Sequence, residues 1–158
     1  MTKDFDKKKF FKQIVGNWEG TAATYFKPDE LADTSPIKGT IIEVLDGSFL
    51  LHEYIGTLMK NKMLGLAIYG YNENKKRFEI AWVDTQHMGP EILFSKGKNT
   101  DDKFSVLAQY TGADENDVWG WRTSLELKDP DNMVIQHFNI TPDGQEYLGV
   151  DIGYKRVK

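Results

Sequence analysis

One carboxylate lies on a strand face that otherwise suits burial. In FEIAWVDT, residues 78–85, the side chains of Phe78, Ile80, Trp82 and Asp84 share a side, because a strand alternates its side chains between two faces. A buried carboxylate requires water, a hydrogen-bond partner or a cation. Two interpretations stay open. Asp84 either lies beside a hollow and serves a ligand, or ends the strand in water and caps the loop at 85–90.

Few other residues could do chemistry. The chain has no cysteine, which excludes disulfides, thiolate catalysis and cysteine-ligated metal. His52, His87 and His137 have no metal-ligand spacing on one element, so we expect no metal site, and we expect His87 in a loop. There is no GxSxG elbow. The candidates for general acid–base work are Asp84 and His52, or Asp84 with a tyrosine.

Length and composition indicate one ordinary globular domain, residues 1–158. Of the 158 residues, 40% are hydrophobic and 13% aromatic, enough for a core. The net charge of −4 argues against nucleic acid and anionic membrane as partners, because both demand a basic surface. No stretch approaches the ~20 apolar residues of a membrane helix, and the N-terminus does not resemble a signal peptide. We therefore expect a cytoplasmic protein.

The elements that must position these residues are mostly short strands. One helix is expected at 4–15, with Asp4 as its cap and Gly16 at its end. From Trp18 onward, alternating runs separated by turn signals every 8–12 residues predict an all-β fold. Because such a meander leaves two exposed edges unless it closes, we expect a ten-stranded antiparallel barrel over 17–157. The break at 27–36 could be a flexible flap. The expected strands are 17–26, 37–45, 48–58, 63–72, 77–84, 90–97, 103–111, 118–128, 133–141 and 145–157.

Aligning the hairpins predicts a hollow beside Asp84. A turn at 72–75 places Tyr69, Ala67 and Gly65 opposite Ile80, Trp82 and Asp84, in that order. A tight turn at 59–62 places His52, Tyr54 and Gly56 opposite Tyr69, Ala67 and Gly65. The small residues on this inward face leave room next to Trp82. A slip of one residue would reverse every side chain.

The far side of the barrel is predicted in the same way. Pairing across 129–132 places Trp121, Thr123 and Leu125 opposite Ile140, Phe138 and Gln136. Pairing across 142–144 turns Tyr147, Gly149 and Asp151 inward. The opposite face of that last strand is more apolar, so either a bulge reverses it or the helix or another subunit covers it. Arg122 is expected to face solvent. The predicted ligand-binding residues are Trp82, Asp84, His52, Tyr54, Tyr69, Trp121, Phe138 and Asp151.

Three stretches together carry a family resemblance. They are IVGNWEG at 14–20, LDGSFLLHEYIG at 45–56 and GLAIYGYNENKKRFEIAWVDT at 65–85. With the ending Tyr154-Lys155-Arg156, they resemble the bacterial domain of unknown function 1579 family. The resemblance covers nearly the whole chain. It implies a lipocalin-like, calycin-type barrel and no activity.

The first strand is also similar to that of other calycins. Gly16-Asn17-Trp18-Glu19-Gly20 matches the GxWxG pattern of lipocalins, fatty-acid-binding proteins and haem-binding nitrobindins, in which the tryptophan plugs one barrel end beneath a helix. Nitrobindins have glycine where this chain has Ala22, and they use a late histidine as the haem ligand. No histidine follows His137, so we expect weak haem binding or none, and no cofactor.

Three functions remain open. The leading one is a binding module that holds a small apolar or aromatic ligand inside the barrel. The second is an enzyme in which Asp84, with His52 or a tyrosine, moves a proton on a bound molecule. The third is a structural barrel, for which a homo-oligomer is an open expectation.

Overall fold

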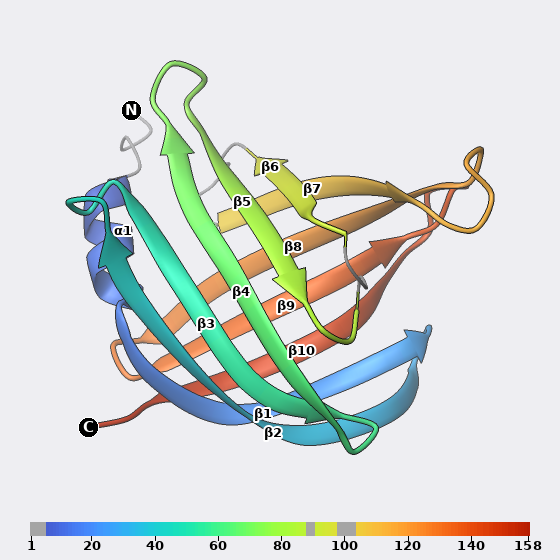
Figure 1. Cartoon of the computed structure of the whole chain (residues 1–158), viewed down its shortest axis with the longest axis horizontal. Coiled ribbons are helices and arrows are strands. Elements are labelled where there is room, and N and C mark those ends of the chain that lie inside the picture. The colour runs from blue at the N-terminus through green and yellow to red at the C-terminus, as the bar shows by residue number, and fades with distance from the viewer. Residues whose placement is uncertain (1–5, 88–90, 98–103) are drawn as a thin grey trace.

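The computed structural model describes residues 6–87, 91–97 and 104–158, which form one helix and ten strands. The strands close into an antiparallel barrel in which β1 pairs with both β2 and β10 (Figure 1). This confirms the predicted fold class. The elements are α1 (Lys7–Ile14), β1 (Gly16–Lys27), β2 (Glu30–Val44), β3 (Phe49–Leu58), β4 (Asn61–Asn72), β5 (Arg77–Asp84), β6 (Leu93–Gly97), β7 (Phe104–Thr111), β8 (Val118–Asp129), β9 (Asn132–Ile140) and β10 (Glu146–Arg156).

The helix α1 lies at one end of the barrel (Figure 1). Trp18, which follows it on β1, is fully buried. The indole Nε1 of Trp18 donates to the carbonyl oxygen of Ile14 at 2.9 Å. The helix cap is Asp6, whose carboxylate accepts from the backbone of Lys9. The predicted cap, Asp4, lies outside the described residues.

Arg156 links α1 to the barrel through hydrogen bonds and a cation–π contact. Its guanidinium stacks 4.2 Å above the Trp18 ring and donates to the carbonyl oxygens of Gln13 and Val15. A third hydrogen bond reaches the carbonyl oxygen of Pro130, in the β8–β9 turn. Carbonyls at the C-terminal end of a helix have no partner within the helix, so this arginine satisfies groups that would otherwise need water.

The predicted flap at 27–36 is wrong. β2 begins at Glu30 and pairs with β1 up to Lys27, so only two residues turn the chain, with Asp29 at a φ of 59°. The segment resembled a loop in sequence because its charged and small residues lie near the rim of the barrel. Much of it remains exposed on both faces of β2.

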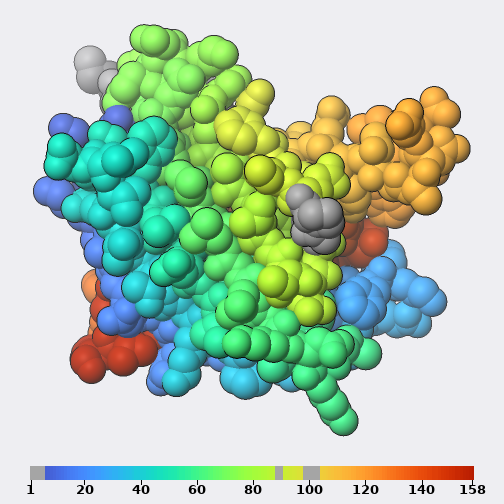
Figure 2. Space-filling view, in the orientation of Figure 1, coloured from blue at the N-terminus to red at the C-terminus, as the bar shows by residue number. Residues whose placement is uncertain are grey.

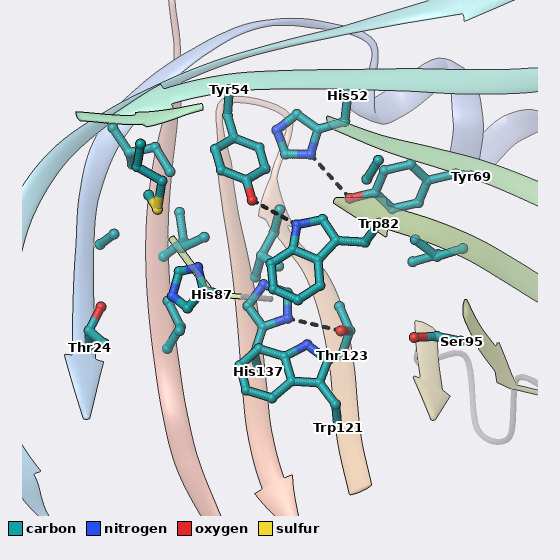
Figure 3. Close-up of a pocket in the computed structure, with 18 of the residues that line it drawn as sticks. Thr24, His52, Tyr54, Tyr69, Trp82, His87, Ser95, Trp121, Thr123 and His137 are labelled. Carbon is teal, nitrogen blue, oxygen red and sulfur yellow. Dashed lines mark hydrogen bonds between the residues drawn. The ribbon is translucent and has the colours of Figure 1, made fainter. Parts of the chain in front are cut away.

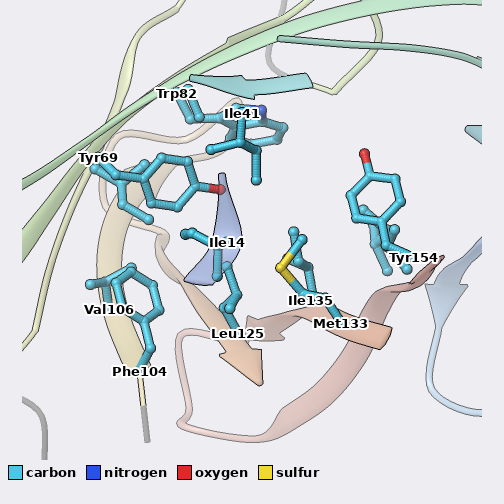
Figure 4. Packing of buried hydrophobic residues seen from close by; sticks show 14 of the residues in the cluster. Ile14, Ile41, Tyr69, Trp82, Phe104, Val106, Leu125, Met133, Ile135 and Tyr154 are labelled. Atoms are coloured by element: carbon cyan, nitrogen blue, oxygen red, sulfur yellow. The ribbon is translucent and has the colours of Figure 1, made fainter. Parts of the chain in front are cut away.

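The interior is filled near α1. Ile14 packs with Phe104, Leu125 and Met133 in a continuous buried cluster (Figure 4). The ring of Phe10 stacks on that of Phe104, with centroids 5.5 Å apart. The part of the barrel interior that side chains leave open therefore lies toward the opposite end of the barrel. Among the described residues, no helix has the length and apolar character needed to span a membrane.

Register decides which side chains reach the interior. The β4–β5 alignment is confirmed, with Gly65, Ala67 and Tyr69 opposite Asp84, Trp82 and Ile80. The β3–β4 alignment is wrong by two residues, because Met59 and Lys60, both at positive φ, make a two-residue turn. His52 therefore pairs with Ala67, and Tyr54 pairs with Gly65. A shift of two leaves every side chain on its predicted face.

The β8–β9 alignment is wrong by one residue, which reverses β9. The turn lies where expected, but an irregularity between Leu127 and Asp129 shifts the strands. His137 is thus opposite Thr123, and Phe138 is opposite Arg122 on the outer face. There the Arg122 guanidinium lies 4.1 Å from the Phe138 ring centroid and pairs with Glu146, as its predicted outward orientation requires.

β10 also has a register shift, between Leu148 and Val150. Beyond it, Val150, Ile152 and Tyr154 are buried. Asp151 pairs with Gln136 as predicted, but alternation places it on the outer face rather than the inner one. The conflict seen in the sequence is therefore resolved by the bulge and by the reversal of β9.

Candidate functional site

Two adjoining hollows open away from α1. The inner cavity has a volume of about 50 Å³, and Figure 3 shows the aromatic and histidine side chains around it. A vestibule of about 380 Å³ lies outside it, bordered by Phe26, Met59 and Tyr110 near the strand ends. The residues that line both are Thr24, Trp82, His87, Trp121 and Val150. A water needs about 10–15 Å³, so the inner cavity has room for a few waters or for one end of a ligand.

Most of the predicted ligand-binding residues lie at these hollows. His52, Tyr54, Tyr69, Trp82 and Trp121 line the inner cavity. Phe138 and Asp151 do not, because the register shifts in β8 and β10 leave both on the outer face. Asp84 is on the inner face, but its carboxylate is covered by neighbouring side chains.

Asp84 accepts hydrogen bonds at both carboxylate oxygens. Oδ1 accepts from the backbone N–H groups of Gln86 and His87, at 2.8 and 2.6 Å. Oδ2 accepts from the Tyr54 hydroxyl at 2.9 Å and lies 2.5 Å from His87 Nδ1. Burial would raise the pKa of Asp84, but the hydrogen bonds and charge of His87, with the backbone donors, lower that pKa below its ordinary value. The group is therefore ionised at neutral pH.

The structure combines one part of each interpretation of Asp84. The carboxylate caps the following loop, but its side chain is fully buried beside the cavity and does not end the strand in water. Its imidazole partner is His87, not His52. The short spacing from Asp84 to His87 is typical of an Asx-type turn, so it was a signal available in the sequence.

Tyr54 joins Asp84 to the aromatic wall. The Trp82 indole Nε1 donates to the Tyr54 hydroxyl at 2.7 Å (Figure 3). That hydroxyl in turn donates to Asp84. Burial and the charge of Asp84 raise the pKa of Tyr54 well above its ordinary value. The space above Gly65 was expected to be hollow. The ring of Tyr54 fills it, with Cζ 1.8 Å from where a Cβ on residue 65 would lie.

Trp82, Trp121 and His137 form an aromatic platform. The Trp82 and Trp121 rings are almost parallel, at 3°, with centroids 5.7 Å apart. The His137 ring lies 5.2 Å from that of Trp121, at 17°. Sequence reasoning missed His137 because only the β8–β9 irregularity turns it inward.

The interior histidines are neutral. Burial lowers the pKa of His52 to about 4. Burial, reinforced by His87, lowers the pKa of His137 to about 3. His52 lies between the hydroxyls of Tyr69 and Tyr154, and His137 Nδ1 lies 2.9 Å from the Thr123 hydroxyl. Within the described ranges, no histidines and carboxylates are grouped so as to hold a metal ion.

Comparison with known proteins gives a family and a fold. The model of a family described as "Protein of unknown function (DUF1579)" matches residues 4–156. The chain belongs to this family. No curated protein matches it.

Two solved structures resemble the DUF1579 chain. One is the S-type phycobiliprotein lyase CPES from Guillardia theta, with 13% identity and a TM-score of 0.58 over 98% of this chain and 94% of that one. At this identity the likeness shows the fold alone. The other, a DUF3598 protein of unknown function from Nostoc punctiforme, has 6% identity and a TM-score of 0.27 over 97% and 100% of the chains, too low for any argument.

Proposed function

We propose that this protein binds a small, flat aromatic or conjugated molecule in its barrel. The observation that carries the proposal is the aromatic platform, whose two indole rings line both the inner cavity and the vestibule. The vestibule is within the size range of small-molecule sites, and the inner cavity accepts one end of a ligand. Near-parallel indole rings suit stacking or edge contacts with a planar ring.

The part of the ligand that enters the barrel is uncharged. His52 and His137 are neutral at pH 7, and the carboxylate of Asp84 is already occupied by four donors. A buried charge on the ligand would find no opposite charge free to pair with it among the described lining residues, and burying an unpaired charge is costly. The barrel shares its fold with the S-type phycobiliprotein lyase CPES, and a small-molecule role fits that fold.

Binding of 2-indanone and of indole tests the proposal. Both are flat, uncharged and of about ten heavy atoms, so we expect dissociation constants between about 10 µM and 1 mM by titration calorimetry. Trp121→Ala should weaken binding at least about 10-fold. The matched control is Trp119→Ala on the same strand, because Trp119 stacks with Tyr110 and lines neither hollow. Absence of saturable binding by both compounds, or an equal effect of the two variants, would contradict the proposal.

A further inference from the structure

Two polar atoms in the wall of the inner cavity have no partner. Within the described part of the chain, His87 Nε2 and Trp121 Nε1 are buried without a hydrogen bond. The centroids of the His87 and Trp121 rings are 6.5 Å apart, and both residues line the inner cavity and the vestibule. A buried polar atom without a partner destabilises the fold, so both atoms are available to hydrogen-bond a molecule in this cavity.

The two atoms are of opposite kinds. An indole N–H only donates. In the neutral form of His87, Nδ1 carries the proton, because it faces the ionised Asp84 at 2.5 Å, and Nε2 then has a free lone pair. The cavity therefore presents one acceptor and one donor. Asp84 is itself held by Tyr54 and two backbone N–H groups, which fixes the direction of the imidazole.

We propose that His87 and Trp121 form a proton-transfer site for aromatic or conjugated ketones that have an acidic C–H beside the carbonyl group. This rests on the proposed function, since the ketone is the ligand held by the aromatic platform. His87 Nε2 is the base, and the Trp121 N–H is the donor to the carbonyl oxygen. Asp84 is the positioning residue, and its charge stabilises the imidazolium that forms.

The step balances without a co-reactant. The C–H bond breaks, and its proton goes to His87 Nε2. The electron pair of that bond forms the C=C bond of an enolate, while the carbonyl π pair moves to oxygen, which accepts the Trp121 hydrogen bond. Return of the proton to the same carbon exchanges hydrogen with solvent, and return to a conjugated carbon isomerises the ketone.

The test is exchange of the methylene protons of 2-indanone in D2O, followed by proton NMR. This compound is flat and uncharged, and its methylene protons are acidic because the enolate is conjugated with the ring. We expect the full chain to accelerate exchange at least about 10²-fold over an equal concentration of imidazole. His87→Gln should abolish the acceleration while binding by calorimetry stays within about threefold.

Further variants separate chemistry from structure. His87→Gly should regain exchange when free imidazole is added, which a purely structural role would not allow. Trp121→Phe, which retains a ring and loses the N–H, should slow exchange roughly 10²-fold. Asp84→Asn should slow exchange, while Asp151→Asn, the same change on the outer face, should leave it unaltered.

The outcomes distinguish this inference from the proposed function. If 2-indanone binds and its exchange is no faster than with imidazole, the proton-transfer site is overturned and the binding function stands. Exchange that persists in His87→Gln also overturns it. If neither 2-indanone nor indole binds, both proposals fall.

Discussion

The hydroxyl of Tyr54 links the Trp82 indole to Asp84 in the barrel wall, and it is the acceptor of the Trp82 N–H. It donates in turn to the Asp84 carboxylate. Sequence reasoning predicted that Tyr54, Trp82 and Asp84 share the inner face. It did not predict this chain of bonds, because hydrogen bonding depends on side-chain rotamers that the strand pattern does not fix.

Replacing Tyr54 with phenylalanine should lower the free energy of unfolding by about 1–3 kcal/mol, because the Trp82 N–H loses its acceptor. Urea denaturation monitored by tryptophan fluorescence measures the change. Tyr71→Phe is the control, since within the described residues no hydrogen bond of its hydroxyl is seen, and it should change stability by less than about 0.5 kcal/mol. Equal losses in the two variants would contradict the role given to the hydroxyl.

The buried histidines make stability depend on pH. The pKa of His52 is lowered to about 4 and that of His137 to about 3, against an ordinary value near 6.5 in the unfolded chain. Below pH 6.5 the unfolded state binds more protons than the folded state. Stability is thus fully present above pH 6.5 and falls as pH drops toward 4.

Each histidine should contribute a slope of up to about 1.4 kcal/mol per pH unit in that window. Urea midpoints measured from pH 7 to pH 4.5 check this. His52→Asn, although less stable overall, should show about half the wild-type slope. A slope unchanged by this substitution would show that His52 does not titrate on unfolding.

At the scale of elements, the strands and most of the turns between them could be predicted from the sequence, but the bulges that set the register of β9 could not. The ten strands follow from alternation and turn signals, and a shift of two residues at the β3–β4 turn changed no face. The irregularity in β8 moved β9 by one residue, exchanging Phe138 for His137 inside the barrel. Such a bulge carries no clear residue signature, so the β9 part of the far wall, with His137, could not be predicted.

The β1–β10 pair closes the barrel, and Gly20 allows the close approach of its two strands. A Cβ at residue 20 would lie 1.7 Å from the carbonyl oxygen of Gly153, a backbone atom that cannot rotate away. Gly20→Ala should therefore cost at least about 3 kcal/mol, measured by urea denaturation.

Gly153→Ala is the matched control at the β1–β10 pair. A Cβ at residue 153 meets nothing within 4 Å, so this change should alter stability by less than about 1 kcal/mol. A mild effect of Gly20→Ala would mean that β1 and β10 can separate without loss of the barrel.

At the scale of the molecule, the expected homo-oligomer stays a prediction. The surface that could form its contact is not the one that the sequence indicated. The apolar side chains of β10 face inward, so that strand no longer needs a covering subunit. Instead, the outer face of β2 to β6, which is toward the viewer in Figure 2, exposes large apolar side chains. They include Ile42, Ile55, Leu64, Ile68 and Phe94.

A second copy of this chain would have to cover that face if the oligomer forms, because a broad exposed apolar patch is unusual on a monomer. Sedimentation velocity at about 5 and 100 µM should then show a concentration-dependent dimer. Ile68→Lys, which places a charge at the β3–β4–β5 face, should shift the population to monomer. Leu45→Lys adds the same charge at an exposed residue of the β2–β3 turn and should leave the dimer intact. A single monomeric species at both concentrations would rule out self-association through this face and leave the barrel to act alone.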